Sequence, residues 1–443
     1  MKNNVFIKYI CVFLILILLF VLALTLSSLF SSKLIYENVK ESSAVLLKEE
    51  NRKIIFIPYR QINMEFDNFT DALMINTAYS IDSKTPLYSA FVARKNYIPN
   101  VTTIVYEDSV GELKSSSKYN YHNEVGELND LVKYEKAESF EYARYWHGYL
   151  TVLRPLLVIF NISQLRIVLT IILIILSIIL AVCISKKTNK IVAIIFMLGL
   201  WSAEYFYLGF SLQGIFVFLI AVIGSIVLTI RCERIKHMGV LFFVTGMLTN
   251  FFDFLTVPLV TLAMPLIIYI TLIKKENANI SLKQQVVTII KYTTLWGIGY
   301  GLTWLTKWIL VDLIYNKNMI KTAVAQVMYR SVGTQKISAL YVIKQNYNYI
   351  ASNFIISIII TFTCINIGTI LNGSNIIKSV DLKAILIRII PYLIIMCMPF
   401  AWYFILKNHS YYHAFFTYRN LAILVICINL CIEEIATMYI NRR

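Results

Sequence analysis

Charged residues are scarce in this chain: they make up 15% of its 443 residues, whereas hydrophobic residues make up 58%. This composition is typical of an integral membrane protein and excludes a soluble globular domain. Acidic residues are nearly absent from most of the chain, since 17 of the 25 lie between positions 31 and 150. The net charge of +16 therefore belongs to the remaining chain. Basic cytoplasmic loops, not nucleic-acid binding, are the usual cause of such a balance.

Cysteine is also sparse, and its placement is informative. Six of the seven cysteines lie in hydrophobic stretches, one lies in a basic loop, and no pair has the spacing of metal ligands. The polar stretch from 31 to 150 has no cysteine at all and must fold without disulfides.

Long apolar runs dominate the rest of the chain. A helix needs about 20 apolar residues to cross a bilayer. The first run lacks an A-x-A cleavage site and is longer than the hydrophobic region of a signal peptide, so we expect a retained anchor. By this measure ten spans are expected, at 9–30, 163–184, 191–209, 211–230, 238–251, 255–273, 285–310, 351–372, 385–406 and 421–438.

Loop charge predicts the orientation. The most basic loops alternate with the others and should be cytoplasmic, which places both termini inside and the polar 31–150 stretch outside. The abundance of Ile, Asn, Lys and Tyr favours an AT-rich bacterial genome. We therefore expect an all-α polytopic protein of the bacterial cell membrane with about ten transmembrane helices. Its expected parts are an anchor at 1–30, an extracytoplasmic loop domain with interfacial helices at 31–162, and a multi-span domain at 163–443.

The loop Asp312–Tyr349 departs from this bias. It carries five basic residues and one acid on the expected outer side. Such a loop is suited to bind phosphate or another anion, but a solvated loop that crosses the membrane regardless of charge is an equal alternative.

The stretch Gln61–Ser80 is predicted to form an amphipathic helix. Helical spacing places Phe66, Phe69 and Leu73 on one face. Asp67 and Asp71, four residues apart, share another face. Two stacked carboxylates beside a membrane suggest acids presented to a substrate, and a solvated acidic face is the alternative.

A second interfacial helix is predicted over Glu138–Phe160, ending or bending at Pro155. Arg144, His147 and Arg154 would form one stripe with Thr151, opposite an aromatic stripe at headgroup depth. A basic stripe at this depth could bind a lipid phosphate, and ordinary interfacial anchoring explains it equally well.

The segment Trp402–Asn420 carries His409 and His413 one helical turn apart, followed by Arg419. An H-x-x-x-H pair can ligate a metal, but the acid of a zinc-protease motif is missing. Imidazoles beside an arginine can equally bind a phosphoryl oxygen.

Ionisable residues inside spans are costly and tend to line cavities. Glu204, Asp253 and Lys307 fall near the outer ends of their predicted helices. The basic and acidic residues near the inner ends are explained by snorkelling. The outer group therefore shares one membrane face with the aspartates and the basic residues described above, which indicates a single outer-leaflet site.

With these residues in place, the chain resembles the GT-C superfamily of polytopic membrane glycosyltransferases, in an uncharacterised branch from low-GC bacteria. The resemblance rests on DNFTDALMINTAY (67–79), YARYWHGYLTVLRPLL (142–157), GMLTNFFDFLTVPLVTLAMPL (246–266) and NHSYYHAFFTYR (408–419), with a large first outer loop followed by many spans. It implies transfer of a sugar from a polyprenyl-phosphate carrier to an extracytoplasmic envelope glycan or lipid. The tandem Asp-Glu doublet of some branches is absent after the first span.

The resemblance also implies roles for particular residues. Asp71 would be the catalytic base, with Asp67 its neighbour or a metal ligand. Supporting acids would be Glu65, Glu204 and Asp253. The carrier phosphate would be bound by Arg144, His147, Arg154, Lys307, His409, His413 and Arg419.

No cofactor is required by this chemistry, although a pyrophosphate leaving group would favour a divalent cation. Two other classes remain open: a transporter or flippase of lipid-linked saccharides, and a non-catalytic envelope-assembly protein. Neither an inverted repeat nor paired broken helices, which would favour a transporter, is apparent in the sequence.

Overall fold

The computed structural model describes residues 2–49, 53–54, 64–65, 67–98, 106–107, 113–114, 124–134, 137–231, 238–277, 279–333, 337–351, 358–360, 362–363, 365, 367 and 382–440. These residues are overwhelmingly helical, and the only strands among them form three two-stranded antiparallel pairs. The helical elements are α1 (Lys2–Leu29), η1 (Ser32–Leu34), α2 (Tyr36–Glu49), α3 (Asn68–Tyr79), α4 (Pro86–Val92), α5 (Glu124–Lys133), α6 (Leu150–Leu157), α7 (Ile162–Lys187), α8 (Lys190–Ser202), η2 (Tyr205–Phe210), α9 (Leu212–Arg231), α10 (Met238–Phe252), α11 (Leu259–Glu276), α12 (Leu282–Tyr315), α13 (Met319–Val332), α14 (Ala339–Ala351), α16 (Leu382–Met396), α17 (Met398–Ile405), α18 (Lys407–Tyr412), α19 (Ala414–Thr417), η4 (Tyr418–Leu421) and α20 (Ala422–Ile440). The strands are β1 (Lys53–Ile54), β2 (Met64–Glu65), β3 (Arg94–Tyr97), β4 (Tyr106–Glu107), β5 (Leu113–Lys114) and β6 (Glu138–Glu141).

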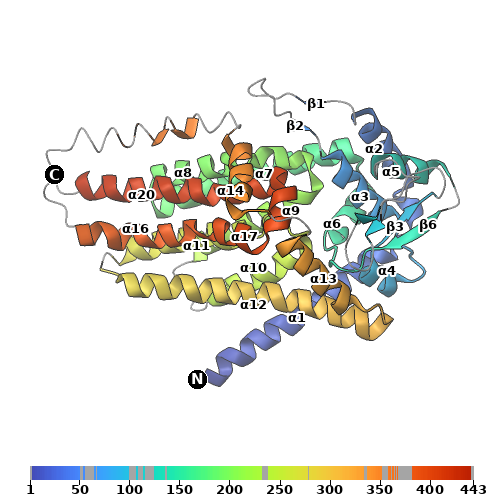
Figure 1. The fold of residues 1–443 in the computed structure, drawn as a ribbon, viewed down its shortest axis with the longest axis horizontal. Coiled ribbons are helices and arrows are strands. Elements are labelled where there is room, and N and C mark those ends of the chain that lie inside the picture. The colour runs from blue at the N-terminus through green and yellow to red at the C-terminus, as the bar shows by residue number, and fades with distance from the viewer. Residues whose placement is uncertain are drawn as a thin grey trace.

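The long helices form a bundle, seen lengthwise in Figure 1. Within the described residues, five helical segments are long and apolar enough to cross a membrane: Val5–Leu29, Ile162–Lys187, Leu212–Arg231, Leu382–Ile405 and Ala414–Met438. Two further apolar helices, α8 and α10, are shorter. This confirms an all-α membrane protein, while the count of ten spans stays a prediction. Most of the span expected at 351–372 lies outside the described residues.

Side-chain caps set several helix boundaries. Asn161 and Gln164 form a capping box at the start of α7, and Ser281 and Gln284 form another at the start of α12. Asn189 accepts a hydrogen bond from the Val192 backbone N–H and begins α8. These side chains satisfy backbone N–H groups that have no partner within the helix.

The bundle is closely packed where α10 meets α12. A Cβ added at Gly246 would collide with the backbone of Trp296, and one added at Gly299 would collide with the backbone of Phe243. These glycines let the two helix backbones touch, as small residues commonly do between membrane helices.

The described part of the 31–162 region is gathered at one end of the bundle, and the last turns of α20 lie toward the other end (Figure 1). Its helix α2 packs against α3 and α5 around Ile35, Val39 and Leu128, which are fully buried. Strand β3 pairs with β6, with Arg94 opposite Glu141. The side of the membrane that this region faces stays a prediction.

Two predicted helices differ from the structure. The helix expected over Gln61–Ser80 begins only at Asn68, because Asp67 caps it and Met64–Glu65 is a strand. Asp71 is fully buried and Asp67 half-buried, while Phe69 is exposed, so the predicted sidedness is reversed. Phe66 lies outside the described residues.

The helix expected over Glu138–Phe160 is not continuous. Its first residues form β6, residues 142–149 are irregular, and only α6 is helical. Pairing of β6 with β3 takes this backbone out of the helix. The predicted single stripe of Arg144, His147 and Arg154 therefore does not exist. Pro155 lies inside α6, which ends two residues later, as the missing proline N–H leads one to expect.

Candidate functional site

Asp67 and Asp71 lie at the start of α3 and face the start of α9. Asp67 is the N-cap: its carboxylate accepts the Thr70 backbone N–H at 3.3 Å and the Ser211 hydroxyl at 3.0 Å. Asp71 is fully buried and accepts the Leu212 backbone N–H at 2.8 Å. The α3 carboxylates are therefore fixed against the turn that begins a candidate membrane span.

Arg166, near the start of α7, is the cation that faces Asp71. Its Nη2 lies 3.0 Å from Asp71 Oδ2, and its Nη1 lies 2.7 Å from Glu49 Oε2. The same Nη2 donates to the Asn68 side-chain oxygen at 3.1 Å. One buried guanidinium thus joins α2, α3 and α7 and serves two carboxylates.

Glu204 and Arg419 complete this group. Glu204 adopts a left-handed backbone conformation (φ 54°), which is strained for a residue other than glycine. Its carboxylate accepts the Tyr418 hydroxyl and lies 3.7 Å from Arg419 Nη2. Arg419 also donates to the Ala203 carbonyl at 3.1 Å. We call Glu49, Asp67, Asp71, Arg166, Glu204 and Arg419 the acid cluster.

The electrostatics of the acid cluster are those of crowded carboxylates. Burial raises the pKa of Asp71 to about 7; the charge of Arg166 opposes this rise, and the neighbouring Asp67 adds to it. Burial also raises the pKa of Asp67, against its hydrogen bonds and the charge of Arg419. Because Arg419 acts on Asp67, the structure brings these two predicted site residues together.

A second group surrounds the connection between α10 and α11. Leu255 has a left-handed backbone (φ 69°), and its carbonyl oxygen lies 2.8 Å from His409 Nε2. The other imidazole nitrogen, His409 Nδ1, lies 2.7 Å from Arg330 Nη1. The rings of His409 and His413 are 4.7 Å apart, as their spacing of one turn predicts. We call Arg330, His409 and His413 the imidazole cluster.

The irregular segment 142–149 approaches the same connection from the other side. Gly148 donates to the Phe251 carbonyl at 2.9 Å, and a Cβ at Gly148 would collide with that oxygen. His147, also in a left-handed conformation (φ 55°), lies 5.3 Å from the Phe254 ring and contacts the Tyr142 carbonyl at 2.7 Å. Burial lowers the pKa of His147 to about 3, so it is neutral and cannot attract a phosphate by charge.

Asp253 has a local structural role in this connection. Its carboxylate accepts the Thr256 backbone N–H at 2.9 Å and the Thr256 hydroxyl at 2.5 Å. Burial raises the pKa of Asp253 to about 6 against these hydrogen bonds. Asp253 thus shapes the loop that carries Phe254 and Leu255, and it is not part of the acid cluster.

Burial also keeps the two imidazoles of the imidazole cluster neutral. The pKa of His409 is lowered well below its usual value by burial and by the charge of Arg330. That of His413 is lowered to about 4 by the same two causes. The positive charge at this place therefore belongs to Arg330 and not to the imidazoles.

Several buried polar atoms near these residues have no hydrogen-bond partner within the described part of the chain. They are His147 Nδ1, Tyr300 Oη, Asn250 Nδ2 and both amide atoms of Gln326. Buried polar groups are rarely left unpaired in native proteins. Their presence here indicates places where water or a ligand completes the hydrogen bonding.

Two predicted site residues donate to backbone carbonyls. Arg154 is fully buried and donates to the carbonyls of Ser27, Ala78 and Phe30, so all three of its nitrogens are engaged in holding the ends of α1 and α3. Lys307 is buried and donates to the Phe91 carbonyl at 2.6 Å. Both cations are thus engaged with backbone carbonyls, and the expectation that they bind phosphate stays a prediction.

Arg144 contacts aromatic side chains. The Arg144 guanidinium lies over the rings of Tyr142 and Tyr145, and its carbonyl accepts the Trp308 indole N–H at 3.1 Å. The backbone of Glu65 pairs with Lys53, and its side chain lies outside the described residues. Nor does the described chain contain a group of three or more His, Cys, Asp or Glu side chains that could hold a metal ion.

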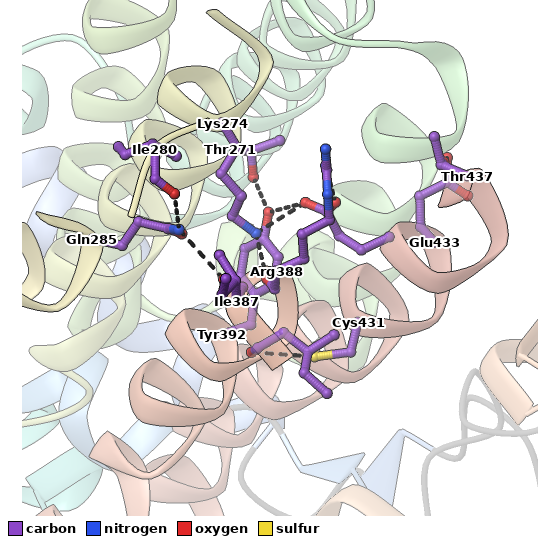
Figure 2. Close-up of polar contacts among 12 residues, drawn as sticks. Thr271, Lys274, Ile280, Gln285, Ile387, Arg388, Tyr392, Cys431, Glu433 and Thr437 are labelled. Atoms are coloured by element: carbon purple, nitrogen blue, oxygen red, sulfur yellow. Dashed lines mark hydrogen bonds and ion pairs between the residues drawn. The ribbon is translucent and has the colours of Figure 1, made fainter. Parts of the chain in front are cut away.

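A further charged network lies at the opposite end of the bundle, between α11, α16 and α20. Figure 2 shows Lys274, Arg388 and Tyr392 converging there. Lys274 Nζ and Arg388 Nη1 each lie 2.9 Å from the Glu434 carboxylate, and the Tyr392 hydroxyl lies 3.3 Å from it. Snorkelling was expected for Arg388 and Glu434, but their charges pair with each other. We call Lys274, Arg388, Tyr392 and Glu434 the distal network.

The sequence interpretation missed three residues that organise these sites. Arg166 lies within a predicted span, and the rule that selected Glu204, Asp253 and Lys307 selects it as well. Ser211 carries no such signal, because a hydroxyl at a helix start is common. Arg330 was visible only as one of several basic residues in a long loop. Comparison of the chain with protein-family models, with curated proteins and with solved structures finds no match.

Proposed function

We propose that this protein is a membrane glycosyltransferase that moves a sugar from a polyprenyl-phosphate carrier to an extracytoplasmic acceptor. The observation that carries the proposal is the acid cluster, where Asp67 and Asp71 meet the domain-side starts of three candidate membrane spans. A site at this level can receive a lipid-linked donor from the membrane and a polar acceptor from outside it.

The chemistry needs a base and a means to stabilise the leaving group. A carboxylate accepts the proton of the acceptor hydroxyl as that oxygen attacks the anomeric carbon of the donor. The bond from that carbon to the carrier phosphate breaks, and cationic groups stabilise the charge that develops on the phosphate. Arg419, which the electrostatics place near Asp67, is the cation of the acid cluster best situated for this role.

Asp67 is the better candidate for the base. It is half-buried, whereas Asp71 is fully enclosed with one oxygen on Leu212 and the other on Arg166. A base must come within hydrogen-bond reach of the hydroxyl that it deprotonates. We therefore propose that Asp67 contacts the substrate and that Asp71 influences the pKa of Asp67 by its charge.

The test uses purified full-length protein in nanodiscs with radiolabelled polyprenyl-phosphate sugars and envelope glycan acceptors. Asp67→Asn should reduce the transfer rate by about 10²–10⁴-fold, as expected for loss of a general base. Glu37→Gln is the matched control, because Glu37 is an exposed acid of the same region. Asp67→Asn protein that folds and transfers at the normal rate would remove Asp67 from the role.

One observation favours a flippase of lipid-linked saccharides as a second candidate. The distal network places charged side chains inside the bundle at the end opposite the acid cluster, and buried charges in membrane bundles often mark a transport path. Reconstituted vesicles with a fluorescent lipid-linked sugar distinguish the two functions. Movement between leaflets without any transfer would favour the flippase.

A further inference from the structure

Helix α13 exposes an apolar stripe. Ile320, Val324, Val327, Met328 and Val332 are all exposed, and their spacing (i, i+4, i+7, i+8, i+12) puts them along one side of the helix. Met328, in the second half of the helix, has 65% of its surface accessible. An apolar stripe of this length is unusual on a surface that faces only water.

The stripe continues the apolar surface of α12. That helix packs against α13 and exposes Leu313 and Ile314 in its last turn, only a few residues before α13 begins. Figure 1 shows α13 beside this end of α12, next to the 31–162 region. A helix that joins a lipid-facing surface in this way is suited to lie in the plane of the membrane interface.

The opposite side of α13 is buried and polar. Ala323 and Gln326 are buried, and Arg330 follows Gln326 by one turn. Gln326 is 3% exposed, yet neither polar atom of its amide has a partner within the described chain. The N–H groups of this amide have no acceptor, and its oxygen has no donor. A ligand that binds beside the arginine could supply both.

The surrounding contacts direct the Arg330 charge toward an anion. The Leu255 carbonyl accepts from His409 Nε2, so the other nitrogen, Nδ1, is the acceptor for Arg330. Within the described residues the Arg330 guanidinium donates only this hydrogen bond, through Nη1. A guanidinium has five N–H groups in a planar fork that fits phosphate. Four donors are left for a ligand.

We infer that α13 lies in the membrane interface and that its buried side, through Arg330 and Gln326, binds the phosphate of a membrane lipid. The stripe is covered by acyl chains, and the phosphate lies under the helix beside His409 and His413. If this phosphate is that of the sugar carrier, the inference rests on the proposed function, and Arg330 is a further cation besides Arg166 and Arg419 of the acid cluster.

Binding is tested with farnesyl phosphate on the full-length protein by isothermal titration. Arg330→Gln should weaken binding by about tenfold or more, since a charge-assisted hydrogen bond is lost. Lys321→Gln removes the same charge from the exposed side of the same helix and should leave the affinity unchanged. Inorganic phosphate and farnesol, each alone, should bind much more weakly than farnesyl phosphate. Equal affinity for inorganic phosphate would show a free-phosphate site and overturn the inference.

The membrane position is tested separately, so that misfolding of Arg330→Gln does not decide the matter. A photoreactive benzoylphenylalanine replaces Met328 in full-length protein in nanodiscs with tritiated phosphatidylglycerol. It should crosslink to the lipid on illumination, whereas the same group at Ser139, an exposed position of β6 in the 31–162 region, should crosslink far less. No lipid crosslink at position 328 would contradict the interfacial placement.

The result is also separable from the proposed function. Farnesyl phosphate binding that depends on Arg330, with no sugar transfer under any donor, would keep this inference and reject the glycosyltransferase. Normal sugar transfer by an Arg330→Gln protein with unchanged affinity would do the reverse.

Discussion

The two ends of the helical bundle both hold buried charges, but their balance differs. The acid cluster contains four carboxylates and two guanidiniums, a formal charge of −2 if all are ionised. At the opposite end, Glu434 faces both Lys274 and Arg388. The adjacent Glu433 accepts from the amide of Asn189 at 3.2 Å, and the distal network itself has one carboxylate for two cations. One end carries unmatched negative charge, and at the other end the carboxylate is matched by cations.

This difference separates a reactive arrangement from a stabilising one. Unmatched buried carboxylates repel each other, which raises their pKa values, and a raised pKa is a feature of catalytic acids and bases. A balanced network gains little reactivity and serves to hold α11, α16 and α20 together. Three substitutions test the comparison, in order of decreasing expected effect.

The largest effect is expected from removing the shared cation of the acid cluster. Arg166→Met leaves Asp71 buried without its partner and Glu49 without its ion pair, and should lower the free energy of unfolding by about 3–5 kcal/mol. Thermal unfolding in detergent measures the loss. Arg388→Met is the matched control, because Arg388 is about one-third exposed and Glu434 keeps Lys274. It should cost less than about 1 kcal/mol. Equal losses would show that the two ends do not differ in this way.

A smaller loss of stability should distinguish the Tyr418–Glu204 hydrogen bond from the Tyr392–Glu434 hydrogen bond. Tyr418→Phe removes the closest described partner of Glu204, whose Arg419 contact is longer at 3.7 Å, and should cost about 1.5–3 kcal/mol. Tyr392→Phe leaves Glu434 with both of its cations, and should cost about 0.5–1.5 kcal/mol. Unfolding measurements on both variants, side by side, give the difference directly. A larger loss for Tyr392→Phe would contradict the assignment of unmatched charge to the acid cluster.

Much of the fold could be predicted from the sequence, because hydrophobic length and loop charge report directly on membrane helices. The apolar spans over α1, α7, α9 and α20 are examples. The 31–162 region was harder. Strand β6 depends on pairing with β3, which lies more than 40 residues earlier in the chain. The residue pattern within 138–160 therefore contains no information about this pairing.

The candidate site was foreseen in its residue types more than in its grouping. Asp67 and Asp71 were selected as carboxylates on one helix face, Arg419 as an arginine beside two imidazoles, and Glu204 as an ionisable residue inside a span. The structure brings these four together. The same reasoning could not tell that Arg154 binds three carbonyls, because a buried arginine that caps helix ends looks the same in sequence as one that binds phosphate. The partners of a buried charge are a property of the fold.

The most diagnostic effect, and the smallest when taken per pH unit, is the pH dependence of stability. The pKa of Asp71 rises from an ordinary value of 3.8 to about 7 in the folded protein, so the native state binds more protons than the unfolded state between these two values. The free energy of unfolding should therefore fall as pH rises from about 4 to about 7, by at most about 1.4 kcal/mol per pH unit from this group. Asp71→Asn should flatten this slope, whereas Glu434→Gln, in the balanced network, should leave the slope due to Asp71 in place. Denaturation at a series of pH values measures it, and an unchanged slope in Asp71→Asn would show that the acid cluster carries no unmatched charge at this aspartate.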